Sequence, residues 1–326
     1  LVFAAGIFAG CGSDKQPAAS GQDGQLKPVK IAFSTWNGFG PLFIARDKGF
    51  FKKHGLDVQI SVIEGMAERK QALAGKQVDA LAITFDTATT VVDAGVPIKI
   101  VWALADSYGA DGLVVKPEIS SVQDLKGKTV AFDAATASHI LLTAILDKNG
   151  MSEKDIKAVQ MTSGDAGAAF VAGKVDAALT WEPWLTKAKN GKVLATSKEF
   201  PGMIVDTIAL HGDFVKANPD VPQKIVNAMA EAMAWYYASP ANTQEGNKIM
   251  AKGFNVAEDE FTKGLQDLKL FNFEENVKMF GDPQTPGVFY GTMERAAALY
   301  LNAKKINTKP DPKNIIDVTY LKNVKK

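Results

Sequence analysis

The sequence has few of the residues that support metal, redox or nucleotide chemistry. It contains one cysteine, Cys11, and no Gly-x-Ser-x-Gly elbow or phosphate-binding P-loop. The glycines near Gly38 do not complete a dinucleotide-binding motif. The three histidines fall on separate segments without metal-ligand spacing: His54, His139 and His211. We therefore expect no metal, no cofactor and no enzymatic activity.

Excess charge of one sign and long apolar runs are also missing. The formal net charge is +1 and no block of Lys or Arg is present, which argues against a nucleic-acid partner. No stretch is long enough to span a bilayer. Hydrophobic side chains make up 46% of the sequence and charged side chains 22%, which is the composition of a globular protein. The length of 326 residues is enough for two domains. We expect a monomer.

The N-terminal segment predicts membrane attachment through a lipid. Residues 1–10 are apolar or small and lack an initiator Met, as at the end of a signal peptide. Phe8-Ala9-Gly10-Cys11 resembles a bacterial lipobox, with Phe8 where Leu is usual. Residues 12–28 have the Gly/Ser/Pro-rich composition of a flexible tether. We expect Cys11 to be lipidated and the protein to lie at the periplasmic or extracellular face of the cell membrane; the alternative is a buried cysteine in a helix.

A short pattern occurs twice, at residues 72–83 and 170–180. Each copy has a helix end, a Gly-Lys turn and a short apolar strand. We expect Gly75 and Gly173 to take the left-handed conformation that ends a helix. The apolar runs indicate buried parallel strands, and ligands of open α/β sheets bind beyond the carboxyl ends of such strands. Two copies, one in each half of the chain, predict two lobes that face one ligand.

Alternation of strand and helix patterns gives the domain organisation. It runs through residues 29–103 and again through 112–196, which predicts two parallel-sheet α/β lobes. The segments 105–112 and 203–210 read as crossover strands that form a hinge. Lobe 1 would comprise residues 29–112 and 204–326, with lobe 2, residues 113–203, inserted into it. The C-terminal part reads as mostly helical, with helices near residues 218–237, 244–252, 259–268 and 292–303.

An ordered series of motifs resembles a known family. It consists of residues 40–45 (GPLFIA), 48–58 (KGFFKKHGLDV), 94–98 (AGVPI), 124–128 (DLKGK), 173–177 (GKVDA) and 181–184 (WEPW). Together they resemble substrate-binding proteins of the nitrate/sulfonate/taurine branch of ABC importers. The resemblance implies a two-lobed periplasmic-binding-protein fold, a small ligand in the cleft, and ABC permease and ATPase partners. Alternatives are a thiamine-pyrimidine precursor enzyme or binder, whose enzymes use a cysteine-rich motif absent here, and a receptor serving a sensor.

Loops that follow the predicted strands supply the candidate ligand-binding residues. They are Trp36, Asn37, Glu64, Asp86, Thr87, Tyr108, Asp111, Thr136, Ser138, Trp181, Glu182 and Asp206, with Phe39 and Asp165 beside them. Acids are numerous in this set, and neither Lys nor Arg occurs in it. One carboxylate about 4 Å from an anion repels it by roughly 4 kcal/mol at an effective dielectric near 20. A cation over a desolvated indole gains about 2 kcal/mol. The set therefore favours a ligand with an ammonium or guanidinium group.

An anionic ligand is the alternative that the sequence leaves open. Thr136 and Ser138 stand at a predicted helix start, where hydroxyls and free backbone N–H groups can bind an oxyanion. Taurine, an alkanesulfonate or nitrate would use that site, and a zwitterion would use the acids as well. Asp86 and Asp133 can also be plain N-caps of the helices that they precede.

Overall fold

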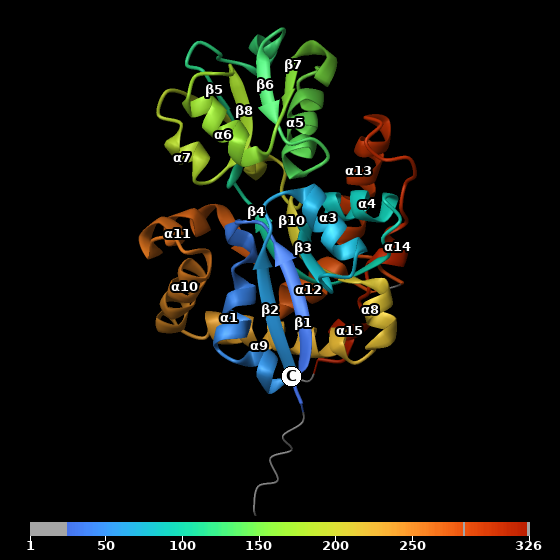
Figure 1. Ribbon diagram of the computed structural model, residues 1–326. Coiled ribbons are helices and arrows are strands. Elements are labelled where there is room, and N and C mark those ends of the chain that lie inside the picture. Colours follow the sequence, from blue (N-terminus) through green and yellow to red (C-terminus); the bar gives the residue numbers. More distant parts are fainter. Residues whose placement is uncertain (1–24, 283, 325–326) are drawn as a thin grey trace, which may run out of the picture.

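Two α/β lobes make up the computed structural model, which describes residues 25–282 and 284–324 (Figure 1). A six-stranded sheet with the order β11-β4-β10-β3-β1-β2 forms the large lobe, and a five-stranded sheet with the order β7-β6-β8-β5-β9 forms the small lobe. The predicted lipobox and Cys11 lie outside the described residues. β1 begins at Lys27, inside the segment that the sequence analysis assigns to the tether.

The sheet of the large lobe is mixed, which corrects the expectation of a parallel sheet. β1 pairs in parallel with β2 and β3, whereas β10 runs antiparallel between β3 and β4. The direction of β10 follows from its place in the chain, because it returns from the small lobe. The strands are β1 (Lys27–Phe33), β2 (Leu56–Val62), β3 (Ala80–Thr84), β4 (Ile98–Ser107), β10 (Val205–His211) and β11 (Leu268–Leu270).

The sheet of the small lobe is mixed in the same way. β6 is parallel to β7 and β8, and β5 is antiparallel to β8 and β9. All five strands come from one continuous segment between β4 and β10, so the small lobe is inserted into the large one. The strands are β5 (Asp111–Val115), β6 (Thr129–Phe132), β7 (Lys157–Gln160), β8 (Ala177–Trp181) and β9 (Lys192–Thr196).

Helices cover both sheets and fill the C-terminal part. Gly49, with φ of 78°, separates α1 from α2. The N-terminal helices are α1 (Pro41–Asp47), α2 (Phe50–Lys53), α3 (Met66–Ala74), α4 (Phe85–Asp93), α5 (Ala137–Lys148), α6 (Ser163–Val171) and α7 (Trp184–Lys187). The C-terminal helices are α8 (Gly212–Ala217), α9 (Val221–Tyr237), α10 (Pro240–Phe254), α11 (Glu258–Gly264), α12 (Phe273–Phe280), α13 (Val288–Asn302), α14 (Pro312–Ile315) and α15 (Thr319–Lys322).

The repeated pattern forms equivalent turns in the two lobes. Gly173 has φ of 72°, as expected, but in the first copy the left-handed residue is Lys76, with φ of 57°, so the prediction for Gly75 is wrong. The aspartates that follow have one structural role. Asp79 Oδ2 accepts from the backbone N–H of Lys30 at 2.8 Å, and Asp176 Oδ2 accepts from that of Thr129 at 2.9 Å. Each carboxylate thereby ties the start of its strand to the neighbouring strand.

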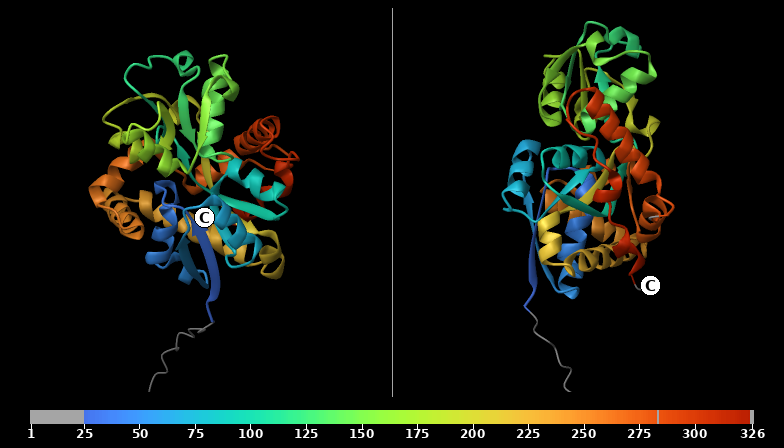
Figure 2. Two further views of the ribbon diagram at one scale, coloured as in Figure 1. Left: turned by 45° about the horizontal axis from the view of Figure 1, so that its top comes forward. Right: turned by 90° about the vertical axis from the view of Figure 1, so that its right-hand side faces the viewer.

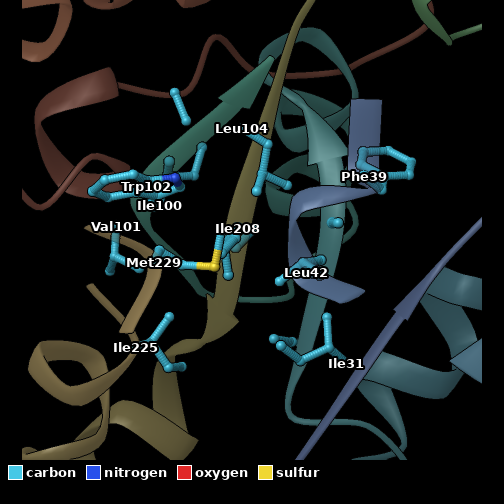
Figure 3. Close-up of a cluster of buried hydrophobic side chains, with 14 of the residues drawn as sticks. Ile31, Phe39, Leu42, Ile100, Val101, Trp102, Leu104, Ile208, Ile225 and Met229 are labelled. Carbon is cyan, nitrogen blue, oxygen red and sulfur yellow. The ribbon is translucent and has the colours of Figure 1, made fainter. Parts of the chain in front are cut away.

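The main core lies where the helix α9 packs on β4 and β10 (Figure 3). Trp102 and Ile208 from these strands are fully buried, as is Met229 from α9. Burying each such side chain stabilises the fold by about 1.5–3 kcal/mol. This core fixes β4 and β10, the two strands that lead toward the small lobe.

One C-terminal helix joins the lobes. α13 packs on α4 of the large lobe and on α5 of the small lobe, and the right-hand view of Figure 2 shows it, in red, beside both. Its buried residues Ala296, Ala297 and Tyr300 form an apolar cluster with Ile140 of α5. Among the described residues, no helix has the length and apolar character needed to cross a membrane.

Candidate ligand-binding cleft

A cavity of about 580 Å³ lies between the lobes. The large lobe lines it with the residues after β1, β2 and β3 and with the start of β10, and the small lobe lines it with the residues after β6 and β8 and with the starts of α5 and α6. The carboxyl ends of parallel strands from both sheets thus face one space, as in other open α/β sheets. We call this cavity the cleft.

The predicted site residues divide into two groups. Those that line the cleft are Trp36, Glu64, Thr87, Asp111, Thr136, Trp181 and Asp206, together with Phe39 and Asp165. Those that do not are Asn37, Asp86, Tyr108, Ser138 and Glu182. For the second group, contact with a ligand stays a prediction that the cavity geometry does not support.

Four side chains of the second group have other environments. Glu182 accepts from the backbone N–H of Thr186 at 3.1 Å and from its hydroxyl at 2.8 Å. The hydroxyl of Ser138 is buried against that of Ser163. Tyr108 is 43% exposed. Asp86 is fully buried, its Oδ2 lies 2.7 Å from the hydroxyl oxygen of Tyr300, and the N-cap of its helix is Thr84 instead.

Asp206 and Trp36 form the base of the cleft on the large lobe. The indole Nε1–H of Trp36 donates to Asp206 Oδ2 at 2.7 Å. Gly38 makes room for this contact, because a Cβ there would lie 2.0 Å from the same oxygen. Burial raises the pKa of Asp206 well above its ordinary value, and the nearby Asp111 raises it further. The other oxygen, Asp206 Oδ1, is buried without a hydrogen-bond partner among the described residues.

Asp111 lies beside it, at the start of β5. It is 2% exposed, and its Oδ2 has no hydrogen-bond partner in the described part of the chain. Burial raises the pKa of Asp111 to about 7, although the hydroxyl of Ser107 opposes the shift. A buried acceptor left unpaired costs about 1–3 kcal/mol. The cleft therefore holds two adjacent carboxyl groups, Asp111 and Asp206, each with one oxygen that a ligand could satisfy.

Indole rings supply the apolar walls. The rings of Trp36 and Trp181, which come from opposite lobes, have centroids 5.9 Å apart and planes inclined at 60°. Trp184 at the start of α7 also lines the cleft, although it is not among the candidate ligand-binding residues. Gly167 of α6 makes room for Trp184, because a Cβ there would lie 2.5 Å from its ring. These faces suit a cation or an aromatic or aliphatic group.

Arg69 is a cleft residue that the sequence analysis missed. It lies in the first half of α3, is 9% exposed, and lines the cleft. Its Nη2 donates to the carbonyl of Glu64 at 3.5 Å, and its Nε has no partner within the described residues. Burial lowers the pKa of Arg69 to about 10, with Glu64 and Asp133 opposing the shift. The candidate set, which contains neither Lys nor Arg, therefore lacks one basic residue that lines the cleft.

Asp133 faces this arginine from the small lobe. It follows β6, lines the cleft, and has a pKa raised to about 6 by burial, an effect that Arg69 opposes. It is not the N-cap of α5, a position that Thr136 occupies. The starts of α5 and α6 both border the cavity, and their free N–H groups favour negative charge. Acidic and anion-binding features therefore share the cleft.

In the part of the chain that the structure describes, the cleft lining does not include His139. Within residues 25–282 and 284–324, no group of three His, Cys, Asp or Glu side chains could hold a metal ion. His139 accepts from the N–H of Ala135 through Nδ1 at 3.2 Å and contacts Glu153 through Nε2 at 3.0 Å. Burial lowers the pKa of His139. Both ring nitrogens are thus engaged outside the cleft.

Comparison with known proteins relates this geometry to a family. The family model described as NMT1/THI5 like matches residues 36–243, which is more than half of the chain. A taurine-binding periplasmic protein of Escherichia coli (strain K12) is 27% identical over 222 residues, which cover 66% of this chain and 69% of that protein.

Solved structures share the fold. The alkanesulfonate-binding protein SsuA from Xanthomonas axonopodis pv. citri, bound to MOPS, matches with a TM-score of 0.72 and 18% identity over 91% of this chain and 100% of its own. The periplasmic nitrate-binding protein NrtA from Synechocystis PCC 6803 matches with a TM-score of 0.69 and 18% identity over 91% and 88%. The predicted two-lobed periplasmic-binding-protein fold is confirmed.

Proposed function

This chain belongs to the NMT1/THI5-like family, and on that basis we propose that it is the substrate-binding protein of an ABC importer of the nitrate, sulfonate and taurine kind. It encloses a small polar ligand between its lobes and delivers it to a permease and an ATPase. It acts as a monomer at the periplasmic or extracellular face of the membrane, held there by a lipid on Cys11. The family, the fold and the cleft support this function, and the binding proteins among its relatives support it over an enzyme.

The ligand that the cleft favours carries an ammonium or guanidinium group. The observation that carries this proposal is the pair Asp111 and Asp206, which are 2% and 0% exposed and each present an unpartnered oxygen. An ammonium group has several donors and no acceptor, so it can satisfy both oxygens at once. An approaching oxyanion would instead leave them unpaired or be repelled.

The charges along the cleft point the same way. Arg69 is the one basic residue in the described lining, against five acids: Glu64, Asp111, Asp133, Asp165 and Asp206. The second candidate is a taurine, alkanesulfonate or nitrate binder, favoured by Arg69 and by the starts of α5 and α6. In that case the anionic end would lie at Arg69, and the ammonium of a zwitterion would lie at Asp111 and Asp206.

Titration calorimetry on the full chain tests both candidates. The probes are guanidinium and small primary amines on one side, and taurine, alkanesulfonates and nitrate on the other. We expect a cation to bind, and Asp206→Asn to weaken it by about 2–5 kcal/mol, the usual effect of removing one partner of a buried charge pair. Glu182→Gln is the control, because that carboxylate lies outside the lining. Binding of nitrate or a simple sulfonate that Arg69→Gln abolishes and Asp206→Asn leaves intact would reject the cation proposal.

Membrane attachment is tested separately. We expect the wild-type protein to sediment with membranes and Cys11→Ser to be soluble, with a lipid-sized mass difference on the N-terminal peptide. Equal distribution of the two proteins would remove the lipid anchor from the proposal and leave the cleft untouched.

A further inference from the structure

The hydroxyl of Tyr300 lies between two acceptors that belong to different lobes. Its oxygen is 2.7 Å from Asp86 Oδ2 on α4 and 2.7 Å from the backbone carbonyl of Thr136 at the start of α5. The tyrosine is 1% exposed. A phenol has one hydrogen, a carbonyl oxygen only accepts, and an ionised carboxylate only accepts. With Asp86 ionised, one of these two short contacts would join two acceptors.

A proton on Asp86 resolves the conflict. The acid then donates from Oδ2 to the Tyr300 oxygen, and Tyr300 donates to the Thr136 carbonyl, so each of the two short contacts contains one hydrogen. The hydroxyl of Thr87 lies 3.4 Å from Asp86 Oδ2 and 2.9 Å from the hydroxyl of Thr84. Neither contact supplies the second hydrogen that the two contacts of Tyr300 require.

The surroundings of Asp86 favour the neutral acid. Asp86 is fully buried, and its Oδ1 is unpartnered within the described chain. Burial raises its pKa, although neighbouring hydroxyl and backbone N–H groups oppose the shift. The titratable groups that interact with it electrostatically come from several elements: Lys70 of α3, Asp111 of β5, Asp206 of β10, His139 of α5 and Tyr300 of α13. Burial lowers the pKa of Lys70 and that of His139, and the charge of Asp86 opposes both shifts.

The ring of Tyr300 is held in place from the small-lobe side. It stacks on His139, with centroids 5.8 Å apart and planes at 23°, and His139 stacks in turn on Phe132 at 5.2 Å. The position of the hydroxyl is therefore fixed by packing against the small lobe, whereas its partner Asp86 belongs to the large lobe.

We propose that Asp86 is kept as a carboxylic acid and that Tyr300 is a positioning residue, which holds the start of α5, and with it the Thr136 side of the cleft, against the large lobe. Tyr300 itself does not line the cleft and acts through Thr136, which does. The inference rests on the proposed ligand-binding function only where it implies an effect of Tyr300 on the affinity of the cleft for its ligand. The hydrogen bonds that join Asp86, Tyr300 and Thr136 can be tested without ligand.

The test compares Tyr300→Phe, Asp86→Asn and Tyr236→Phe in the full-length, ligand-free protein. Tyr236→Phe is the matched control, because Tyr236 donates to Asn247 Oδ1 at 2.8 Å inside the large lobe alone. The asparagine amide can donate to Tyr300 as the protonated acid does, so Asp86→Asn preserves the chain. Tyr300→Phe removes it while keeping the ring.

The first readout is native-state hydrogen exchange at His139 and Ile140, whose amides donate to the Thr136 carbonyl at 3.0 and 3.2 Å. We expect exchange there to rise about fivefold to tenfold in Tyr300→Phe, the effect of losing one hydrogen bond, and to stay near wild type in Asp86→Asn and Tyr236→Phe. At higher pH, Asp86 loses its proton in the wild type, so the exchange rates of these amides should rise by more than the pH dependence of exchange in an unfolded peptide accounts for. In Asp86→Asn they should show no such extra rise.

The second readout is infrared spectroscopy of protein labelled with ¹³C-aspartate. Asp111 and Asp206 also contribute to the protonated-carboxyl absorption at pH 7, because burial raises the pKa of both. We expect this absorption to lose intensity in Asp86→Asn and to shift in part in Tyr300→Phe, and the loss in Asp86→Asn stands even if Tyr300→Phe folds poorly. A spectrum unchanged by Asp86→Asn, or exchange in Asp86→Asn that matches Tyr300→Phe, would overturn the proposal. Loss of ligand binding by every protein, wild type included, would count against the proposed function instead.

Discussion

The hydroxyl oxygens of Ser107 and Ser197 lie 2.8 Å apart, although 90 residues separate them in the sequence. Ser107 ends β4 and Ser197 follows β9, so the contact joins the two chain segments that pass between the lobes. Ser197 also accepts from the N–H of Gly109 at 2.9 Å, and Ser107 accepts from the N–H of Asp111 at 3.2 Å. The pair thus ties the predicted hinge segment 105–112 to the chain that follows β9, next to the cleft residue Asp111.

A double-mutant cycle on this pair measures how strongly the crossovers are coupled. We expect Ser107→Ala and Ser197→Ala each to lower the free energy of unfolding by about 1–3 kcal/mol, because each leaves a backbone N–H without its acceptor. Their effects should be non-additive by at least about 0.5 kcal/mol. Urea unfolding gives these values, with the exposed Ser61→Ala as the control. Strict additivity would show that the two hydroxyls act independently.

Affinity for a cationic ligand should rise with pH. Burial raises the pKa of Asp111 to about 7 and that of Asp133 to about 6, so both bind protons in the empty cleft at pH 5.5 and lose them toward pH 8. An ammonium group requires the ionised form of Asp111, so binding near pH 7 should release protons. Calorimetry in buffers of different ionisation enthalpy measures this release. Affinity that falls across the same range would indicate an anion.

The proton release has an internal control. Asp111→Asn keeps the shape of the side chain and removes its titration, so the rise in affinity between pH 6 and 8 should become shallower. Glu182→Gln should leave the profile unchanged, because that side chain lies outside the cleft lining.

Asn276 should be one of the most sensitive positions for stability. It is fully buried on α12, where its Oδ1 accepts from the N–H of Ala103 at 2.8 Å and its Nδ2 donates to the Ala103 carbonyl at 3.0 Å. The pairing between β4 and β10 has a register shift next to Ala103. Asn276→Ala leaves both backbone groups buried and unpaired, at about 1–3 kcal/mol each. We expect chemical unfolding to show a loss of at least about 2 kcal/mol, against almost none for Asn302→Ala at the exposed end of α13.

Gly38→Ala should disturb the base of the cleft. Its Cβ would lie 2.0 Å from Asp206 Oδ2 and 2.6 Å from the indole nitrogen of Trp36, so these two side chains must separate. Overpacking of this kind costs about 1–3 kcal/mol. We expect a lower melting temperature and altered Trp fluorescence. Gly164→Ala is the comparison, since its Cβ would meet nothing closer than 3.7 Å; equal effects would rule out the Trp36–Asp206 contact as the cause.

Much of the architecture could be predicted because its signals are local. Turn residues bound each apolar run, and the alternation of strands with helices indicates the two lobes and the insertion. The direction of β10 could not be predicted in this way. A strand that is buried on both faces has the same apolar pattern whichever way it runs. The three-residue strand β11, Leu268–Leu270, is too short to show any period.

The cleft shows a sharper limit. Asp86 and Thr87 are neighbours on α4, yet Thr87 lines the cleft and Asp86 faces Tyr300. Successive residues of a helix point about 100° apart, so a rule that selects the residues after a strand cannot choose between them. Arg69 was missed for a related reason. It lies on α3 and not in a loop that follows a strand, yet the first turns of α3 lie at the same edge of the sheet.

The position of β10 between β3 and β4 also bears on biosynthesis. β3 and β4 leave the ribosome early, but the strand that joins them into one sheet is made only after all five strands of the small lobe. The small lobe is therefore the first part of the chain that can complete its sheet during translation, and we expect the large sheet to close later. Limited proteolysis of stalled nascent chains ending near residue 235 should find the small lobe protected before residues 27–107 are.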